Sequence, residues 1–150
     1  YLLYHFLLFA SLYYFFKVIK APHMLLTFMY IEDIIQLLSL FSAFSFIFFG
    51  ISCLFSTYMK SEFKRYGLKH YQKLVGTLQI LGALGLFLGQ WLSLSIQGLA
   101  ALGLSILMFL GFLTRLKIRD SLLQSSSSLF YAVLNAIIVI LMLNEQFSLF

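Results

Sequence analysis

The stretch that decides the fold is "LVGTLQILGALGLFLGQWLSLSIQGLAALGLSILMFLGFL", residues 74–113. It contains no Asp, Glu, Lys or Arg, and the short neutral link "SLSIQ" divides it into apolar runs at about 74–92 and 96–113. A helix that crosses a bilayer needs about 20 mostly apolar residues, with about 17 as the lower limit. Both runs meet that length, and the short link predicts that the two helices form an antiparallel hairpin.

Three further apolar segments flank this hairpin. One run covers about 34–59, another covers about 129–143 with the neutral "QSSSS" before it, and the third is "YLLYHFLLFASLYYFF" at 1–16. Backbone groups in lipid must be satisfied within a helix or a closed barrel, and these runs lack the alternation of barrel strands. The sequence therefore predicts an all-α fold, a transmembrane antiparallel four-helix bundle, with an extra N-terminal apolar helix whose status stays open.

The composition supports a membrane protein. The chain has 150 residues, of which 62% are hydrophobic and 10% are charged, and its mean hydropathy is +0.99. A water-soluble domain carries about 25% charged residues. The net charge of +5 is concentrated between apolar runs, which fits lipid headgroups and does not indicate nucleic-acid binding. We expect an N-terminal apolar segment at 1–30 and a four-span membrane domain at 31–150.

The loop charges predict the orientation. The link at 60–73 carries five Lys and Arg, the link "SLSIQ" carries none, and the link at 115–124 carries three. Cytoplasmic loops hold the excess of Lys and Arg in membrane proteins. We therefore expect both basic loops in the cytoplasm and the chain in the inner (plasma) membrane as a multi-pass protein. Glu32-Asp33 and the C-terminus would then lie outside.

The segment at 1–16 does not follow this scheme. As a fifth span it would place Lys17 and Lys20 outside, against the charge rule, and it lacks the basic start of a signal peptide. A start at Met24 or Met29 would leave a self-consistent four-span protein.

Glycines mark the expected helix contacts. Gly82, Gly85 and Gly89 follow an i, i+3, i+7 spacing that places them on one helical face. Apolar helices in lipid associate through the close packing that small side chains allow. We predict packing within one chain, with a face for a second copy or another subunit as the alternative. The predicted packing positions are Gly76, Gly82, Gly85, Gly89, Gly98 and Gly103, with Ala100, Ala101 and Gly111 beside them.

The charged residues of the two basic loops form a predicted cytoplasmic mouth. These loops are expected to set the topology and to contact lipid headgroups. In the alternative, Glu62 also pairs with Arg65 three positions later, and Asp120 pairs with a cation of the other basic loop. Exposed pairs of this kind contribute about 0–1 kcal/mol each. The mouth consists of Glu62, Lys64, Arg65, Arg115, Arg119 and Asp120.

Neutral polar residues are few in the predicted spans: Gln36, Gln79, Gln90 and Asn135, with several Ser and Thr. Ion-coupled transporters usually hold ionisable groups there, so the pattern disfavours such an activity. Gln79 and Asn135 are the best-placed interior pair. They would form an interhelical hydrogen bond, or else line a pocket for a ligand such as a quinone.

Other chemistry-bearing residues are isolated. Cys53 is the single cysteine, which excludes an intrachain disulfide and favours a buried apolar role. The three histidines, His5, His23 and His70, lie far apart and show no metal-ligand spacing. We therefore expect no metal and no catalytic residue.

Two motif-bearing stretches resemble the DoxX-like family of small four-helix membrane proteins. They are "SEFKRYGLKHYQKLVGTLQILGALGLFLG" at 61–89 and "ALGLSILMFLGFLTRLKIRD" at 101–120. The likeness covers about 35–143 and rests on Phe63, Gly67-Leu68, Gly76, Leu78, Gly82 and the exit "LTRLKIRD".

This resemblance implies an inner-membrane bundle of mostly unassigned activity. Some relatives look like membrane subunits associated with thiosulfate:quinone oxidoreduction or other redox complexes, and distant eukaryotic ones are linked to membrane-protein assembly. Members often carry Glu where this chain has Gln79, and Gln keeps the hydrogen bonding without the charge.

The combined expectation is a non-catalytic subunit or assembly partner of a membrane complex. The alternatives are a quinone-linked redox membrane subunit and a small-solute carrier or channel. Expected partners are the lipid bilayer and either other membrane subunits or a second copy, and quinone is the one candidate cofactor.

Overall fold

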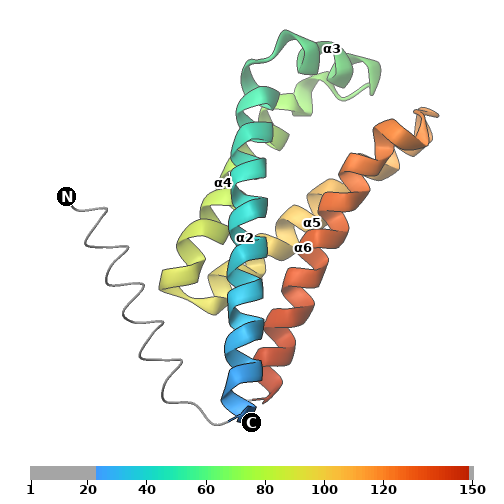
Figure 1. Cartoon of the computed structure of the whole chain (residues 1–150). Coiled ribbons are helices and arrows are strands. Elements are labelled where there is room, and N and C mark those ends of the chain that lie inside the picture. The colour runs from blue at the N-terminus through green and yellow to red at the C-terminus, as the bar shows by residue number, and fades with distance from the viewer. Residues whose placement is uncertain (1–22, 149–150) are drawn as a thin grey trace. The chain divides into compact units, whose positions relative to one another are not determined.

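The computed structural model describes residues 23–148, and no strand occurs among them. The predicted helix at 1–16 lies outside this range. The helices are α2 (His23–Phe55), α3 (Thr57–Arg65), the 3-10 turn η1 (Lys69–Tyr71), α4 (Gln72–Leu92), α5 (Leu94–Lys117) and α6 (Leu122–Ser148) (Figure 1). The chain divides into two compact units, Tyr1–Ile34 and Ile35–Phe150. The second unit contains the bundle, and the all-α prediction is confirmed.

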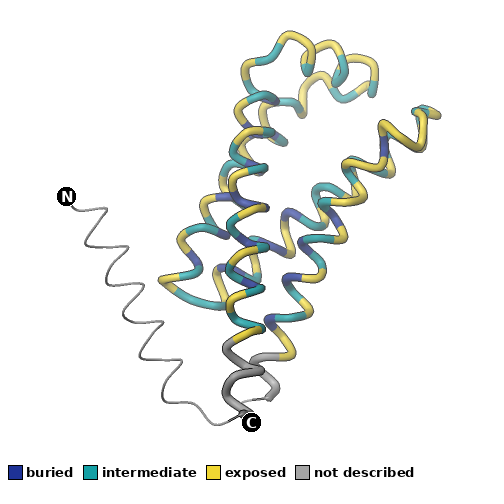
Figure 2. Tube along the Cα trace, viewed as in Figure 1, coloured by how far each residue is buried: buried dark blue, intermediate teal, exposed yellow. Residues whose placement is uncertain are grey.

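Among the described residues, four helical segments are long and apolar enough to cross a membrane, as predicted. They are Tyr30–Phe55, Lys69–Leu92, Leu94–Lys117 and Leu122–Asn144. A helix of 24 residues is about 36 Å long, more than the roughly 30 Å of a hydrocarbon core. Each of these helices carries exposed large apolar residues, including Phe48, Leu81, Leu99 and Ile140. Figure 2 shows exposed positions along all four helices. The chain is therefore a multi-pass membrane protein.

The predicted run at 34–59 is wrong at its C-terminal end. Helix α2 stops at Phe55, because Ser56 takes an extended conformation (φ −76°, ψ 130°). A separate helix, α3, follows with the polar sequence "TYMKSEFKR". Its charged side chains favour the membrane surface over the bilayer core. The basic link predicted as a loop is thus largely helical.

The α4–α5 hairpin closes tightly over the single residue Ser93, whose side chain accepts a hydrogen bond from the Ser95 N–H at 3.3 Å. The three glycines of the predicted stripe all face α5. A Cβ atom placed on Gly82, Gly85 or Gly89 would lie 2.6–2.7 Å from Leu104, Ala100 or Gln97 respectively. The stripe therefore serves packing within the chain.

Gly76, also a predicted packing position, makes its close contact with a different helix from the three glycines of the stripe. It faces α2, where an added Cβ would lie 2.9 Å from Leu54 and 3.2 Å from the Gly50 carbonyl oxygen. Gly50 is the matching close-approach position on α2 and was not predicted. The remaining predicted glycines are not close-packed: an added Cβ would meet only Met142 at 3.8 Å from Gly98, and nothing within 4 Å from Gly103 or Gly111.

A layer of buried polar side chains joins α2 to α5 and α6. Gln97 Nε2 donates to Ser39 Oγ at 2.9 Å, and Ser42 Oγ donates to Asn135 Oδ1 at 2.9 Å. Interhelical hydrogen bonds of this kind average about 0.6 kcal/mol in membranes. These bonds hold α2 against α5 and α6 near the middle of the bundle and toward the end away from the two basic segments. We call the opposite end, which carries 60–73 and 115–124, the basic end.

Candidate functional site

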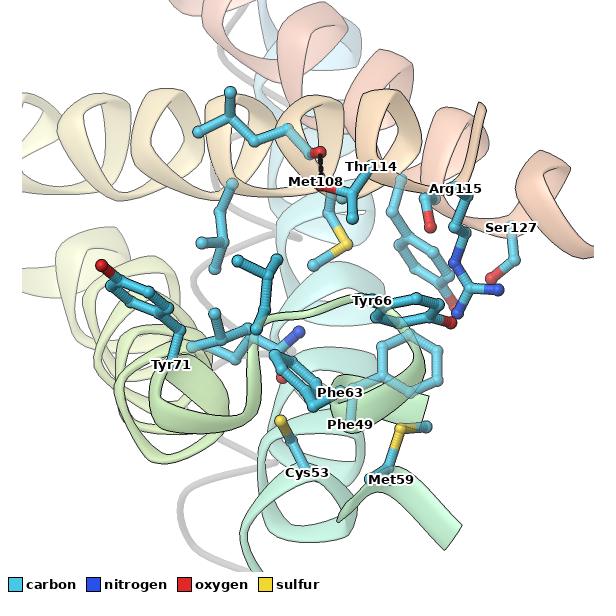
Figure 3. Close-up of a pocket in the computed structure, with 18 residues that line it drawn as sticks. Phe49, Cys53, Met59, Phe63, Tyr66, Tyr71, Met108, Thr114, Arg115 and Ser127 are labelled. Atoms are coloured by element: carbon cyan, nitrogen blue, oxygen red, sulfur yellow. Dashed lines mark hydrogen bonds between the residues drawn. The ribbon is translucent and has the colours of Figure 1, made fainter. Parts of the chain in front are cut away.

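A cavity of about 400 Å³ lies at the basic end of the bundle (Figure 3). All four long helices line it: Phe49 comes from α2, Val75 from α4, Leu107 and Met108 from α5, and Tyr131 from α6. The volume falls within the roughly 300–1,000 Å³ typical of small-molecule sites. The wall is mostly aliphatic and aromatic, so it suits an apolar molecule.

Helix α3 and the turn after it form one side of this cavity, which we call its cover. Met59, Phe63 and Tyr66 all line it, and their i, i+4, i+7 spacing places them on one helical face. Figure 3 shows these three residues around the same space as Cys53 and Met108. This cover was not predicted from the sequence, although the helical spacing of its three residues is visible there.

Gln79 lies at the deep end of the cavity. Tyr71, Val75 and Gln79 line it at four-residue intervals along one face, and Gln79 is farthest from the basic end. Gln79 is 7% exposed, and its Oε1 atom is buried without a hydrogen-bond partner. A buried amide oxygen in this condition is available to a ligand that brings a donor.

Asn135, the other predicted pocket candidate, does not line the cavity. Its Oδ1 accepts from Ser42, and its Nδ2 donates to the Tyr131 carbonyl oxygen at 2.8 Å. Asn135 is completely buried, and these two contacts satisfy its amide on both sides. The predicted Gln79–Asn135 pair is therefore not formed, because the Asn135 side chain faces Ser42 of α2 instead.

Arg65 forms two ion pairs beside the cavity, with Glu62 and with Asp120, and we call this group together with Tyr66 and Arg115 the charged rim. It contacts Glu62 (Nη2–Oε2, 2.7 Å) and Asp120 (Nη1–Oδ1, 2.6 Å), so the structure contains both ion pairs anticipated from the sequence. The side chain of Asp120 is 3% exposed. The hydrogen bond from Arg65 lowers the pKa of the Glu62 carboxyl group, and both acidic partners raise the pKa of Arg65.

Tyr66 lies between two cations at this rim. Its ring centroid is 5.2 Å from the Arg65 guanidinium and 5.6 Å from that of Arg115, within cation–π range. Its hydroxyl group donates to Glu62 Oε2 at 2.9 Å. Burial, followed by this hydrogen bond, raises the pKa of Tyr66. These contacts link Tyr66, Arg65, Glu62 and Arg115 at the rim, and Figure 3 shows two of them, Tyr66 and Arg115, near each other.

Two helix ends shape the rim. After α3, the Gly67 N–H bonds to the Lys64 carbonyl (3.1 Å) and the Leu68 N–H to the Phe63 carbonyl (2.9 Å), with Gly67 at φ +73°. After α5, the same Schellman pattern recurs with Arg119 in the left-handed position at φ 60°. Arg119 thus turns the chain so that Asp120 follows at the rim, while Lys64 remains on the exposed surface of α3.

Cys53 also lines the cavity and helps to fix α2 against α4. Its thiol donates to the Gln72 carbonyl oxygen at 3.4 Å, and Gln72 Nε2 donates back to the Cys53 carbonyl oxygen at 2.6 Å. His70 is exposed in η1. Within residues 23–148, no three His, Cys, Asp or Glu residues group as metal ligands would. The groups that could orient a bound molecule are Gln79 at the deep end and Arg115 at the rim.

The comparisons with known proteins agree with this architecture. A family model described as the DoxX-like family matches residues 37–141, from α2 into α6. Neither the comparison with curated proteins nor the comparison with solved structures gave a match.

Proposed function

The chain belongs to the DoxX-like family and contains four helices able to span a membrane, and on this basis we propose that it is a non-catalytic subunit or assembly partner of an inner-membrane complex. Its contribution would be to hold a lipophilic molecule in the cavity at the basic end. The partner would be another membrane subunit or a second copy of the chain.

The character of the cavity wall supports this proposal most directly. The wall consists mainly of aliphatic, aromatic and sulfur-containing side chains, and Arg115 contributes charge at its rim. Burying apolar ligand surface against such a wall gives binding energy of roughly 25 cal/mol per Å² before the costs of association. The described carboxylates nearby, Glu62 and Asp120, are engaged by Arg65 instead of facing the cavity. Such a site favours binding over acid–base chemistry.

The distribution of charge supports a cytoplasmic position for the cavity. The helix ends around it carry Lys and Arg, whereas the α4–α5 turn at the opposite end carries none. We therefore propose that the basic end faces the cytoplasm. Cysteine-accessibility labelling of single cysteines placed in η1 and at Ser93, in a Cys53→Ala background, tests this orientation. Modification of the η1 cysteine by a membrane-impermeant reagent in intact cells would contradict it.

Purification in mild detergent tests the role as a subunit. The tagged full chain should bring down the same membrane proteins, identified by mass spectrometry, in repeated preparations. Variants in which exposed residues of α3 are replaced serve as a control. They show whether the recovered proteins bind through the charged rim. Recovery of the chain alone from several detergents and from native nanodiscs would refute the subunit proposal.

A quinone-linked redox subunit is the second candidate, because an amide side chain stands at the deep end of an apolar cavity. The Nε2 group of Gln79 could donate a hydrogen bond to a quinone carbonyl. Lipid extracts of the purified protein should then contain quinone, and Gln79→Leu should reduce it about tenfold. Extracts without quinone would eliminate this candidate while leaving the subunit role intact.

A further inference from the structure

Gln79 lines the deep end of the cavity, and its Oε1 atom is a buried acceptor without a hydrogen-bond partner. Two other buried amides in the described bundle are paired: Asn135 accepts from Ser42, and Gln97 donates to Ser39. Gln90 Nε2 and Ser125 Oγ also lack partners, but neither residue lines the cavity. Gln79 is therefore distinguished by combining an unpaired buried oxygen with an adjacent space large enough for a molecule.

Several donors in the cavity wall are already committed elsewhere. The Cys53 thiol donates to the Gln72 carbonyl, the Thr114 hydroxyl to the Leu110 carbonyl at 2.9 Å, and the Tyr131 hydroxyl to Ser45 at 3.0 Å. The Thr114 bond is drawn in Figure 3. The Tyr66 hydroxyl is likewise bound to Glu62. None of these donors contacts Gln79 Oε1, so a molecule in the cavity is one source of the missing donor.

The dimensions and polarity of the wall specify the rest of that molecule. From Leu107 to Arg115, both of which line the cavity, α5 rises about 12 Å at 1.5 Å per residue. Between Gln79 and the rim the wall is dominated by Phe49, Val75, Met108 and similar groups. These surfaces suit an apolar body that extends from the deep polar end toward the rim.

We propose that the cavity binds a lipophilic alcohol or phenol, whose hydroxyl group enters first and donates to Gln79 Oε1. This inference rests on the proposed role in holding a lipophilic molecule, and it adds the chemical class and the orientation. A molecule with only acceptor groups gains no hydrogen bond from the Gln79 oxygen, so the site should prefer a molecule that carries a donor.

A matched pair of probes tests two claims separately: that the cavity holds a lipophilic molecule, and that the hydroxyl group of this molecule donates to Gln79 Oε1. Para-hexylphenol and its O-methyl ether share the same apolar body, but only the phenol can donate. Their affinities for the full-length purified chain in nanodiscs are measured by ligand-induced shifts in thermal unfolding and by equilibrium dialysis. The variants are Gln79→Leu, Gln79→Met as a second apolar replacement, and Gln90→Leu as a control on the same helix outside the cavity.

Wild type and Gln90→Leu should bind the phenol about tenfold more tightly than the ether. Both Gln79 variants should bind the two probes equally. Equal binding of both probes by wild type, as expected if a water molecule satisfies Gln79, would overturn the inference but leave the lipophile-holding role standing. A phenol preference that survives Gln79→Met would overturn it as well. Binding of neither probe would overturn both the inference and that role.

Discussion

Arg65 and Asp120 are 55 positions apart in the sequence, yet they form a two-pronged contact, with Nη1–Oδ1 at 2.6 Å and Nη2–Oδ2 at 3.1 Å. Parallel hydrogen bonds between a guanidinium and a carboxylate are both directional and comparatively strong. This contact ties the end of α3 to the turn after α5. Because α3 covers the cavity, the pair fastens its cover to the opposite rim.

Replacing Arg65 should loosen that cover. Arg65→Met leaves the nearly buried Asp120 carboxylate without its closest partner, so we expect faster hydrogen exchange in α3 and a lower midpoint of thermal unfolding. Hydrogen–deuterium exchange with mass spectrometry measures the first effect. Lys64→Met removes the adjacent charge and keeps the contact, and it should leave exchange in α3 unchanged. Equal exchange in wild type and Arg65→Met would show that the pair does not hold α3 in place.

The stability of the rim should fall in acid. The folded-state pKa of Glu62 lies below its ordinary value, chiefly through the hydrogen bond from Arg65, with Tyr66 and Arg115 also facing it. Its contribution is therefore fully present above about pH 4.3 and is lost as the pH falls through the lower folded-state pKa. Thermal unfolding of wild type between pH 6 and 3 should show this loss, and Glu62→Gln should remove that part of the dependence. Identical pH profiles would contradict the role of Glu62.

The hairpin should not tolerate a methyl group at Gly89. A Cβ there would lie 2.6 Å from the backbone nitrogen of Gln97, and backbone cannot move aside as a flexible side chain can. We expect Gly89→Ala to destabilise the protein by about 1–3 kcal/mol. Gly103→Ala adds its methyl group to open space and should change stability by less than about 1 kcal/mol. Unfolding in detergent measures both, and equal effects would refute the close contact.

Introducing glycine at one Schellman turn and removing it from the other should change the free energy of unfolding in opposite directions. Arg119 occupies a left-handed conformation at φ 60°, where a side chain costs about 1 kcal/mol. Arg119→Gly should therefore raise the free energy of unfolding by roughly this amount, and Gly67→Ala should lower it by about as much. Chemical unfolding in mixed micelles provides the measurement. A loss of stability in Arg119→Gly would indicate that its side chain contributes more than its backbone costs.

Gln79 and Asn135 should differ in their effect on the ligand-free protein. Gln79→Leu removes an unpaired buried polar atom, so it should stabilise the empty protein by about 1 kcal/mol. Asn135→Leu breaks the bond to Ser42 and should destabilise it by about 1–3 kcal/mol. Thermal unfolding of delipidated samples compares the two variants. If both variants changed the stability in the same direction, the difference between the unpaired Gln79 and the paired Asn135 would be contradicted.

The sequence was sufficient to predict features that depend on local pattern. The uncharged stretch at 74–113 predicted the α4–α5 hairpin, and the spacing of Gly82, Gly85 and Gly89 predicted the face that packs in it. Long apolar runs also predicted the four spans. These properties follow from helical periodicity and bilayer thickness, which a single sequence encodes.

Features that depend on the rotation of each helix about its own axis, and so on which face meets which neighbour, could not be predicted from the sequence pattern. Gly76 and Gln79 are only three positions apart, yet one faces Gly50 of α2 and the other lines the cavity. Asn135 turned toward Ser42, and the cover formed by α3 depends on the break at Ser56. Apolar residues on every side of a membrane helix give little indication of which side meets protein.

Cys53 gives the cavity a native chemical reporter. It is the single cysteine of the whole chain, it is 3% exposed, and it lines the space beneath α3. Its alkylation rate should therefore record how often α3 opens, and a molecule bound above the thiol should slow that reaction. Occupancy can thus be followed in native membranes on the unaltered protein, before the occupant itself has been identified.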